Sequence, residues 1–338
     1  MKQTVLLIKT SSLGDVLHLL PALSDARQQR PELTFHWVVE ESFAEVAGWH
    51  EGVERVIPVA LRRWRKTPWS ALRSGEVHRF LGALRATAYA PVVDAQGLFK
   101  SACMARLARG WRIGFDRQTA RESWAAWLYQ EPLAIDRAQH AVPRLRQLLA
   151  AALRYPLPDS PPDYGLTVRF PRRKGLETGA DYDYVFLHGT TWSSKQWPEG
   201  LWWELARLSA PHRVLLPWGN AEERARAERI ARLAPGRIRV APRADLTQLA
   251  VWLSAAQAVV AVDTGPGHLA AALGVPVVGL YGPTNPHRTG TVGPNSHWLQ
   301  GACDRLACLQ RVCPLGDPPP CWGALSPERV WSVLQSIA

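Results

Sequence analysis

The chain has 338 residues, of which 47% are hydrophobic, and its net charge at neutral pH is +11. This length allows two ordinary domains that each bury a core, which excludes a fibrous or largely disordered protein. No apolar run reaches the ~18 residues of a membrane-spanning helix and a core strand begins too early for a secretory signal, so we expect a cytoplasmic protein. The charge favours an anionic partner, whether a phosphorylated substrate, a lipid surface or nucleic acid.

The first loop of the chain is the first candidate for chemistry. Residues 5–22 predict an apolar strand that continues through Ser11, Ser12 and Gly14 into a helix with Asp15 in its first turn. In an open parallel α/β sheet, a loop at the carboxyl end of a strand is where ligands bind. Ser12 and Asp15 also fit a capping box, so a structural and a functional role stay equally open. The loop carries no nucleotide-binding motif.

Apolar, β-rich runs alternate with helical patterns along both halves of the chain. The predicted strands are 5–9, 35–40, 55–59 and 91–95, then 184–189, 213–219, 237–242, 258–263 and 276–282. This alternation predicts parallel sheets in two α/β domains, 1–160 and 184–338, joined by a proline-rich linker over 161–183. A last helix over 327–337 is expected to pack back on the N-terminal domain. The default ligand site is the cleft between the domains.

Two basic stretches lie in the first half. The first contains Arg62, Arg63, Arg65 and Lys66, and the second contains Arg121. A solvated surface explains such stretches, and basic residues between aromatic ones also line nucleic-acid grooves. Because both stretches share a half with Asp15, we prefer an acceptor site for an anionic molecule near a membrane surface.

The loop 188–195 follows the first predicted strand of the second half. The hydroxyls of Thr190 and Thr191 and the ammonium of Lys195 suit a phosphate group. An exposed polar loop would have the same composition. The functional interpretation gains weight because similar chemistry follows a later strand.

That later loop, 263–268, reads Asp-Thr-Gly-Pro-Gly-His. Its glycines let a ligand approach the backbone, and the helix start presents free amides to a diphosphate. Asp263 is then available for a sugar hydroxyl and His268 for a phosphate oxygen. After a third strand end, Glu223 suits ribose hydroxyls, although a simple helix-start charge explains it equally.

Two patterns that suggest a metal ion are weighed and set aside. Asp181-Tyr182-Asp183 matches an Asp-x-Asp metal motif but precedes its strand, which places it at the amino edge of the sheet. Cys303, Cys308, Cys313 and Cys321 are separated by four, four and seven residues and lack Cys-x-x-Cys pairs. We predict reduced structural thiols, no metal and no cofactor.

Eight motifs between residues 5 and 286 carry a family resemblance. They are KTSSLGDVLH, VVEESFAEVAGWH, VIPVALRRWRK, DAQGLFKS, QTARE, QHAV, HGTTWSSKQWPE and VDTGPGHLAAAL. Together they resemble the ADP-heptose:lipopolysaccharide heptosyltransferases, glycosyltransferase family 9, and most closely its type I members. The resemblance implies a GT-B fold, with two Rossmann-like, doubly wound parallel-sheet domains facing a central cleft. The segment 303–322 departs from the pattern, so its cysteines receive no role.

The resemblance also implies an inverting transfer of heptose and a role for each matching residue. Asp15 is the general base that takes a proton from the inner Kdo of Kdo2-lipid A. The donor, ADP-heptose, is bound by Thr190, Thr191, Lys195, Glu223, Asp263, Thr264, Gly265 and His268. The acceptor is bound by Ser11, Ser12, Gly14, Arg62, Arg63, Arg65, Lys66, Arg121 and His140. The enzyme is then expected at the cytoplasmic face of the inner membrane, as a peripheral protein.

Other functions stay open at the level of the sequence. A later heptosyltransferase of the same pathway would carry similar motifs and differ in its acceptor. A GT-B nucleotide-sugar epimerase would share the fold and donor loops but needs no anionic acceptor patch. A nucleic-acid-binding protein explains the charge but not the two polar loops, so no nucleic-acid partner is expected.

Overall fold

The computed structural model describes residues 3–172, 181–305 and 307–338. The chain divides into two compact units, Met1–Gly165 and Leu166–Ala338, and the division falls inside the stretch predicted as a linker. Part of that predicted linker, 173–180, lies outside the described residues. Among the described helices, none combines the length and the apolar character needed to cross a membrane.

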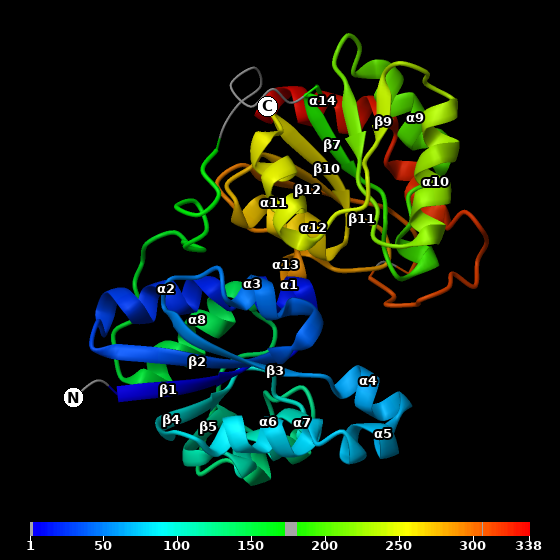
Figure 1. Cartoon of the computed structure of the whole chain (residues 1–338). Helices are drawn as coiled ribbons and strands as arrows, with labels where there is room; N and C mark the ends of the chain where they lie inside the picture. Colours follow the sequence, from blue (N-terminus) through cyan, green and yellow to red (C-terminus); the bar gives the residue numbers. More distant parts are fainter. Residues whose placement is uncertain (1–2, 173–180, 306) are drawn as a thin grey trace. The chain divides into compact units, whose positions relative to one another are not determined.

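The N-terminal unit is built on a parallel sheet with the described strand order β3-β2-β1-β4-β5-β6 (Figure 1). Its strands are β1 (Gln3–Ile8), β2 (Leu33–Glu40), β3 (Val53–Val59), β4 (Ala88–Asp94), β5 (Arg109–Phe115) and β6 (Glu131–Leu133). Its helices are α1 (Leu13–Leu17), α2 (Leu20–Gln29), α3 (Ala44–Ala47), α4 (Leu61–Lys66), α5 (Pro68–Arg73), α6 (Glu76–Arg85), α7 (Phe99–Leu107) and α8 (Ala141–Leu153). This is the Rossmann order, whose topological switch point lies between the ends of β1 and β4.

Helices cover both faces of the N-terminal sheet (Figure 1). On one face, Phe80 of α6 and Met104 of α7 pack against Leu6 of β1. On the other face α2 packs against α8, and Arg146 of α8 binds the buried Asp25 carboxylate of α2 through two hydrogen bonds of 2.6 and 3.0 Å. A parallel sheet covered on both faces explains why its central strands are nearly continuous apolar runs.

The C-terminal unit has a parallel sheet with the described strand order β12-β11-β10-β7-β8-β9. Its strands are β7 (Tyr184–Leu187), β8 (Val214–Leu216), β9 (Ile238–Val240), β10 (Ala258–Val262), β11 (Val277–Tyr281) and β12 (Ser296–Gln300). Its helices are α9 (Glu199–Leu208), α10 (Ala221–Arg232), α11 (Leu246–Ala255), α12 (Gly265–Ala272), α13 (Pro286–Thr289) and α14 (Pro327–Ile337). From the β9 edge this is again the Rossmann order, with its switch point between β7 and β10.

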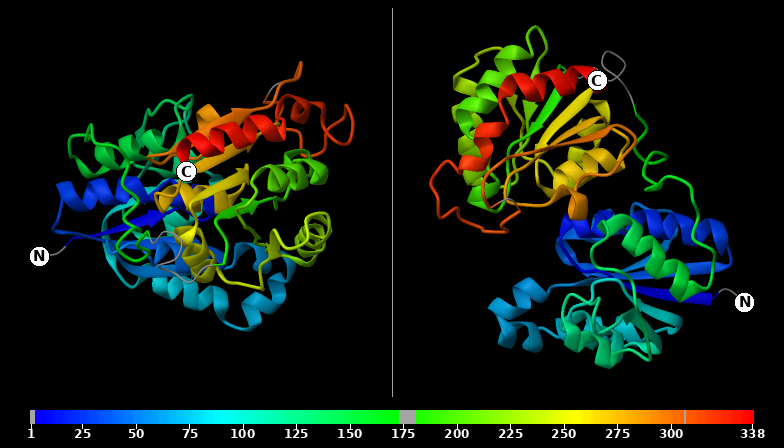
Figure 2. Two further views of the ribbon diagram at one scale, coloured as in Figure 1. Left: turned by 90° about the horizontal axis from the view of Figure 1, so that it is seen from above. Right: turned by 180° about the vertical axis from the view of Figure 1, so that it is seen from behind.

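Helices α9, α10 and α14 share one core with the C-terminal sheet. Trp197 and Trp202 are fully buried in this core, beside Ile230 of α10 and Val330 and Leu334 of α14. Figure 2 shows α14, in red, lying along the C-terminal unit. The apolar face of α14 is therefore buried against its own unit. It does not need the N-terminal domain to cover it, as the sequence-based expectation had assumed.

The nine strands predicted from apolar runs are all present, but three strands escape the pattern. These are β5, β6 and β12, of which β6 and β12 lie at sheet edges and β5 lies next to one. Most residues of β6 and β12, and the first four residues of β5, are exposed or half-buried. A strand that is not buried on both faces needs no continuous apolar run, so its sequence resembles a loop.

Candidate active site

Asp15 lies in the first turn of α1, at the switch point of the N-terminal sheet. Its Oδ2 accepts hydrogen bonds from the backbone N–H (2.9 Å) and the hydroxyl (3.1 Å) of Ser12. Lys9, the residue after β1, places its Nζ 3.7 Å from Asp15 Oδ1 and donates to the Ala95 carbonyl at 3.1 Å. The Lys9 side chain is buried, whereas that of Asp15 is 30% exposed. The carboxylate is thus fixed on its inner side and accessible from outside.

The surroundings of Asp15 favour its ionised form. Burial raises its pKa, but the Lys9 ammonium, the Ser12 N–H and Arg121 outweigh burial, and the pKa of Asp15 lies below its ordinary value. Burial lowers the pKa of Lys9, while the charges of Asp15 and Asp94 oppose that change. An ionised, positioned carboxylate is able to accept a proton from a substrate hydroxyl.

Residues at the end of β4 and just after it support the N-terminal switch point. The Gln96 side-chain oxygen accepts a hydrogen bond from the backbone N–H of Thr10 at 3.0 Å. The fully buried Asp94 accepts from the hydroxyls of Ser101 and Tyr129, both at 2.7 Å. The motifs of the sequence did not indicate the roles of Lys9, Asp94 and Gln96. The position of Asp94 and Gln96 at the end of a predicted strand was the available signal.

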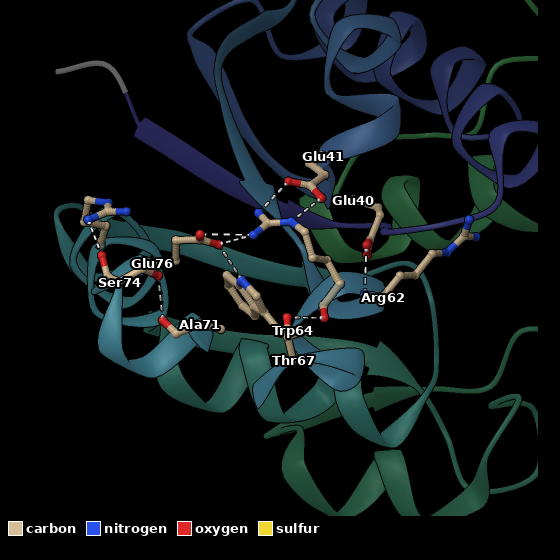
Figure 3. A network of polar contacts seen from close by, with 10 residues as sticks. Glu40, Glu41, Arg62, Trp64, Thr67, Ala71, Ser74 and Glu76 are labelled. Carbon is tan, nitrogen blue, oxygen red and sulfur yellow. Dashed lines mark hydrogen bonds and ion pairs between the residues drawn. The ribbon is translucent and has the colours of Figure 1, made fainter. Parts of the chain in front are cut away.

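Arg63, expected to bind the acceptor, is already paired within the N-terminal unit. Its guanidinium binds the carboxylates of Glu41 at 3.0 Å and Glu76 at 2.8 Å. The Trp64 indole N–H also donates to Glu76, at 2.8 Å. Figure 3 shows Glu41, Glu76 and Trp64 converging in this network. Arg63 therefore anchors α4 on the unit, whatever else it contacts.

The other basic residues of α4 are differently placed. Arg65 and Lys66 are exposed, and within the described part of the chain neither side chain has an ion-pair or hydrogen-bond partner. The backbone N–H of Arg62 donates to Glu40 at 3.0 Å, and its guanidinium lies over the Phe43 ring, 5.5 Å from the centroid. Arg65 and Lys66 are thus the α4 side chains best placed to bind an anion.

His140 is positioned near α1. Its Nδ1 accepts a hydrogen bond from the Val142 N–H at 3.1 Å, which caps α8, and its ring packs edge-on against His18, with centroids 5.6 Å apart. His18 directly follows the last residue of α1, so His140 belongs to the surroundings of the Asp15 helix. Ser11 is half-buried and Gly14 buried in the same loop and helix.

The C-terminal unit brings four of the predicted donor residues together at its own switch point. Lys195 Nζ lies 2.7 Å from Asp263 Oδ2, and His268 Nε2 lies 3.8 Å from Asp263 Oδ1. The Thr190 hydroxyl donates to the Asp263 carbonyl at 3.3 Å. Burial raises the pKa of Asp263, but His268 and Lys195 outweigh it and hold that pKa well below its usual range. The loops after β7 and β10 therefore form one charged site.

The start of α12 adds a positive helix end to this site. Thr264 is its N-cap residue with no side-chain cap, and Gly265 is the first helical residue, with no acidic residue in the first turn. Thr191 is exposed on the neighbouring loop. A helix N-terminus without an acidic cap attracts phosphate groups through its amides and its dipole.

Glu223 reaches the same switch point from α10. Its Oε2 accepts a hydrogen bond from the Gly219 N–H at 2.7 Å. The close approach of Glu223 to the loop after β7 depends on Gly189, because a Cβ at position 189 would lie 2.7 Å from the Glu223 carboxyl carbon. The structure thus places a carboxylate beside the loop that carries Thr190.

The C-terminal segment contacts the loop 188–195 directly, which the sequence did not indicate. The Ser194 hydroxyl donates to the Gln310 carbonyl at 2.6 Å, and the Ser193 hydroxyl donates to the Arg311 carbonyl at 3.2 Å. The Trp322 indole N–H donates to the Ser194 carbonyl at 3.1 Å. The cysteine-bearing segment therefore supports the loop that carries Lys195.

The Asp181-Tyr182-Asp183 motif lies just before β7, as predicted, and its side chains are engaged there. Asp181 is bound by Arg239 at 2.5 Å, and Asp183 accepts from the Arg213 N–H at 2.9 Å. The Tyr182 hydroxyl donates to the Trp252 carbonyl at 2.9 Å. These contacts give the motif a structural role at the amino edge of the sheet.

Two Rossmann-like units in one chain, each with polar residues at its switch point, fit the GT-B type of glycosyltransferase. Residues 77–317 match the family described as Glycosyltransferase family 9 (heptosyltransferase). Lipopolysaccharide heptosyltransferase 1 of Pseudomonas aeruginosa is 47% identical, over 98% of this chain and 97% of that protein. The chain belongs to glycosyltransferase family 9, which confirms the resemblance in its motifs, and it is a lipopolysaccharide heptosyltransferase.

Solved structures agree with this assignment. The structure described as E. coli heptosyltransferase WaaC with ADP has a TM-score of 0.88 and 42% identity, and the match covers 99% of this chain and 100% of that chain. WaaC with ADP-2-deoxy-2-fluoro heptose gives a TM-score of 0.86 and 41% identity with the same coverage. This similarity extends across both units of the chain.

Proposed function

We propose that this enzyme transfers L-glycero-D-manno-heptose from ADP-heptose to the inner Kdo of Kdo2-lipid A, with inversion at the anomeric carbon. The observation that carries the proposal is the Asp15 carboxylate, held by Ser12 and Lys9, in a protein whose C-terminal unit brings Lys195, Asp263 and the start of α12 together at its switch point. The solved WaaC structures support the donor, because they hold ADP and an ADP-heptose analogue.

In the proposed reaction Asp15 is the general base. Its carboxylate accepts the proton of the acceptor hydroxyl as that oxygen bonds to the anomeric carbon of the heptose. The bond from this carbon to the donor phosphate breaks, and ADP leaves with the electron pair. Lys9 and Ser12 hold the carboxylate in place, which orients it for proton transfer.

Lys195 and the start of α12 stabilise the departing ADP. The Lys195 ammonium is paired with Asp263 and is able to turn to a diphosphate beside it, while the α12 amides and His268 bind further oxygens. Asp263 then accepts hydrogen bonds from heptose hydroxyls, and Glu223 binds the ribose. With these positive groups offsetting the charge on ADP, we propose a reaction without a catalytic metal or a cofactor.

The basic residues of the N-terminal unit bind the acidic acceptor. Arg65 and Lys66 are exposed and Arg121 is close enough to Asp15 to act on its charge, so these side chains are able to contact Kdo carboxylates or lipid A phosphates. Because this acceptor sits in a bilayer, we propose that the enzyme works as a peripheral protein at the cytoplasmic face of the inner membrane.

Product analysis tests the proposal. Purified enzyme is incubated with ADP-heptose and Kdo2-lipid A in the presence of a chelator, and products are measured by mass spectrometry. We expect one heptose per acceptor. Transfer only to an acceptor that already carries heptose would instead assign a later step of the pathway. Epimerisation of a UDP-sugar without any acceptor would contradict glycosyl transfer.

A further inference from the structure

Four of the five cysteines converge on one cavity in the C-terminal unit. Cys303, Cys308, Cys313 and Cys321 line this cavity of ≈ 20 Å³, together with Arg305 and with Gly282 and Pro283, which follow β11. All four are free thiols in the structure. Their spacing along the sequence gave no metal-ligand pattern, and only the fold brings them together.

Backbone hydrogen bonds bring these cysteines to the cavity from different parts of the segment. The Ala302 N–H donates to the Cys321 carbonyl at 3.2 Å, which places Cys303 beside Cys321. The Leu309 N–H donates to the Pro283 carbonyl at 2.9 Å, which draws Cys308 to the end of β11. Ala307 and Leu309, on either side of Cys308, both have left-handed φ angles, of 54° and 56°. Non-glycine residues seldom adopt this conformation, so the chain bends tightly around Cys308.

The part of the segment around Cys308 and Cys313 has no apolar core of its own. Between β12 and the start of α14 the described chain forms one short helical turn, at Pro320–Ala324. Leu309, Val312 and Leu315, which lie near Cys308 and Cys313, are 60%, 71% and 53% exposed, whereas Trp322 and Leu325 near the C-terminal end of the segment are buried in the core. Irregular segments without a core of their own are commonly stapled by disulfides or by a metal ion.

We propose that Cys303, Cys308, Cys313 and Cys321 bind one zinc ion that fastens this segment against the loop 188–195. Four thiolates without an imidazole form a closed, tetrahedral structural site of the kind zinc prefers. The cavity has room for about one water or one ion, which favours a single ion over an iron–sulfur cluster.

Zinc binding requires the thiols to move inward and lose their protons. As the structure stands, no three His, Cys, Asp or Glu side chains in the described ranges are grouped to hold a metal ion. Metal sites commonly form together with local folding, and each thiol releases its proton to solvent as its sulfur bonds to the ion. Four thiolates around Zn²⁺ leave a charge of −2, and Arg305, which lines the cavity, carries a positive charge that would offset part of it.

The proposed ion has a structural role, distinct from the transfer reaction. Gln310, Arg311 and Trp322 lie among or next to these cysteines and hydrogen-bond the Ser193–Lys195 turn. A fastened segment therefore stabilises the loop that carries Lys195. Since this link to the donor rests on the proposed function, it is tested separately from metal binding.

Metal content tests the site directly. The full chain is purified under reducing conditions, loaded with zinc, desalted and analysed by elemental mass spectrometry, alongside Cys308→Ser, Cys313→Ser and the matched control Cys103→Ser from α7. We expect about one zinc per chain in the wild type and the control, and little in the two cavity variants. Wild type without zinc, zinc retained equally in the cavity variants, or iron in its place would overturn the proposal.

Thiol labelling of the wild type covers the case in which a cavity variant fails to fold. With zinc bound, we expect four thiols to be protected and to become reactive when a chelator removes the ion. Disulfides among the four, or reactivity unchanged by the chelator, would contradict the site. ADP affinity is measured on the same samples, with a loss of about tenfold expected on zinc removal. Zinc binding without that loss would keep the site and overturn its link to the donor loop.

Discussion

The buried ammonium of Lys9 lies 3.7 Å from the carboxylate of Asp15, the proposed general base. Lys9 is held there by its hydrogen bond to the Ala95 carbonyl, so it is a fixed part of the N-terminal switch point. A positive charge at this place favours the ionised carboxylate and lowers the pKa of Asp15, so we expect this pair to determine the acid limit of activity.

Replacing Lys9 by methionine removes the charge and keeps most of the side-chain volume. The pKa of Asp15 then rises, so the acid limb of the kcat/KM profile moves to higher pH, by about one unit. The measurement is the pH profile with both substrates, beside the surface control Lys100→Met on α7. An acid limb at the wild-type position in a folded Lys9→Met enzyme would show that Lys9 does not tune the base.

Lys195→Met is expected to weaken ADP binding by about 10- to 100-fold, the effect of losing one charge-assisted hydrogen bond. The change also leaves the buried Asp263 carboxylate without its 2.7 Å partner, which lowers stability. Calorimetric titration with ADP measures the affinity. Adding Asp263→Asn should restore stability but not affinity, and unchanged ADP binding in Lys195→Met would remove Lys195 from the donor site.

Gly189→Ala tests the placement of Glu223. The new Cβ would come within 2.7 Å of the Glu223 carboxyl carbon and push the side chain off the Gly219 N–H. We expect the KM for ADP-heptose to rise by about tenfold with little change in melting temperature. Gly200→Ala, where a Cβ meets no atom within 4 Å, is the matched control. Equal KM values in the two variants would argue against ribose binding by Glu223.

Arg63 and Arg65 should respond differently to substitution, although they stand two positions apart. Arg65→Ala is expected to raise the KM for Kdo2-lipid A by about tenfold and leave melting unchanged, because the Arg65 side chain has no partner among the described residues. Arg63→Ala breaks the contacts with Glu41 and Glu76 and frees α4, so both KM and kcat should change. Identical kinetic effects from both variants would contradict this division.

We expect the free energy of unfolding to depend on pH through the titration of His50. Burial lowers the pKa of His50 to about 4. Its Nδ1 accepts from the Gly52 N–H at 3.0 Å, so the neutral ring is held with Nε2 donating to Ser24 at 2.9 Å. Below the unfolded-state pKa near 6.5, His50 is protonated in the unfolded chain but stays neutral in the folded chain. The free energy of unfolding therefore falls as the pH drops.

Between pH 7.5 and 5.0 this residue should account for a loss of about 2 kcal/mol in the free energy of unfolding. Urea unfolding at the two pH values measures the loss in the wild type and in His50→Asn, which cannot titrate. The variant should lose about that much less than the wild type over the same interval. Equal losses would show that another group dominates.

The sequence predicted most of the fold because buried parallel strands are continuous apolar runs. The runs at β1, β4, β7 and β10 fixed both switch points, and the polar residues after them marked Asp15, Lys195 and Asp263. β5, β6 and β12 escaped because less buried strands lack that pattern. The motifs then supplied the family, which the apolar pattern alone does not specify.

What the sequence left out depends on long-range contact. Lys9 is one basic residue at the end of a strand until the fold shows it buried beside Asp15. Arg63 and Arg65 are equivalent in the sequence pattern, but in the fold Arg63 is bound by Glu41 and Glu76. The four cysteines of the C-terminal segment have uninformative spacing, and only the folded chain brings them to one cavity. Such pairings join residues far apart in the sequence, so no local pattern encodes them.

The most direct test of the account compares the wild type with Asp15→Asn in heptose transfer from ADP-heptose to Kdo2-lipid A, with a chelator present. Asparagine keeps the shape of the side chain but cannot accept the proton. The account predicts transfer of one heptose by the wild type, a kcat lower by about 10² or more in Asp15→Asn, and equal ADP affinity in the two proteins. Comparable rates in both proteins would contradict the assignment of Asp15 as the base.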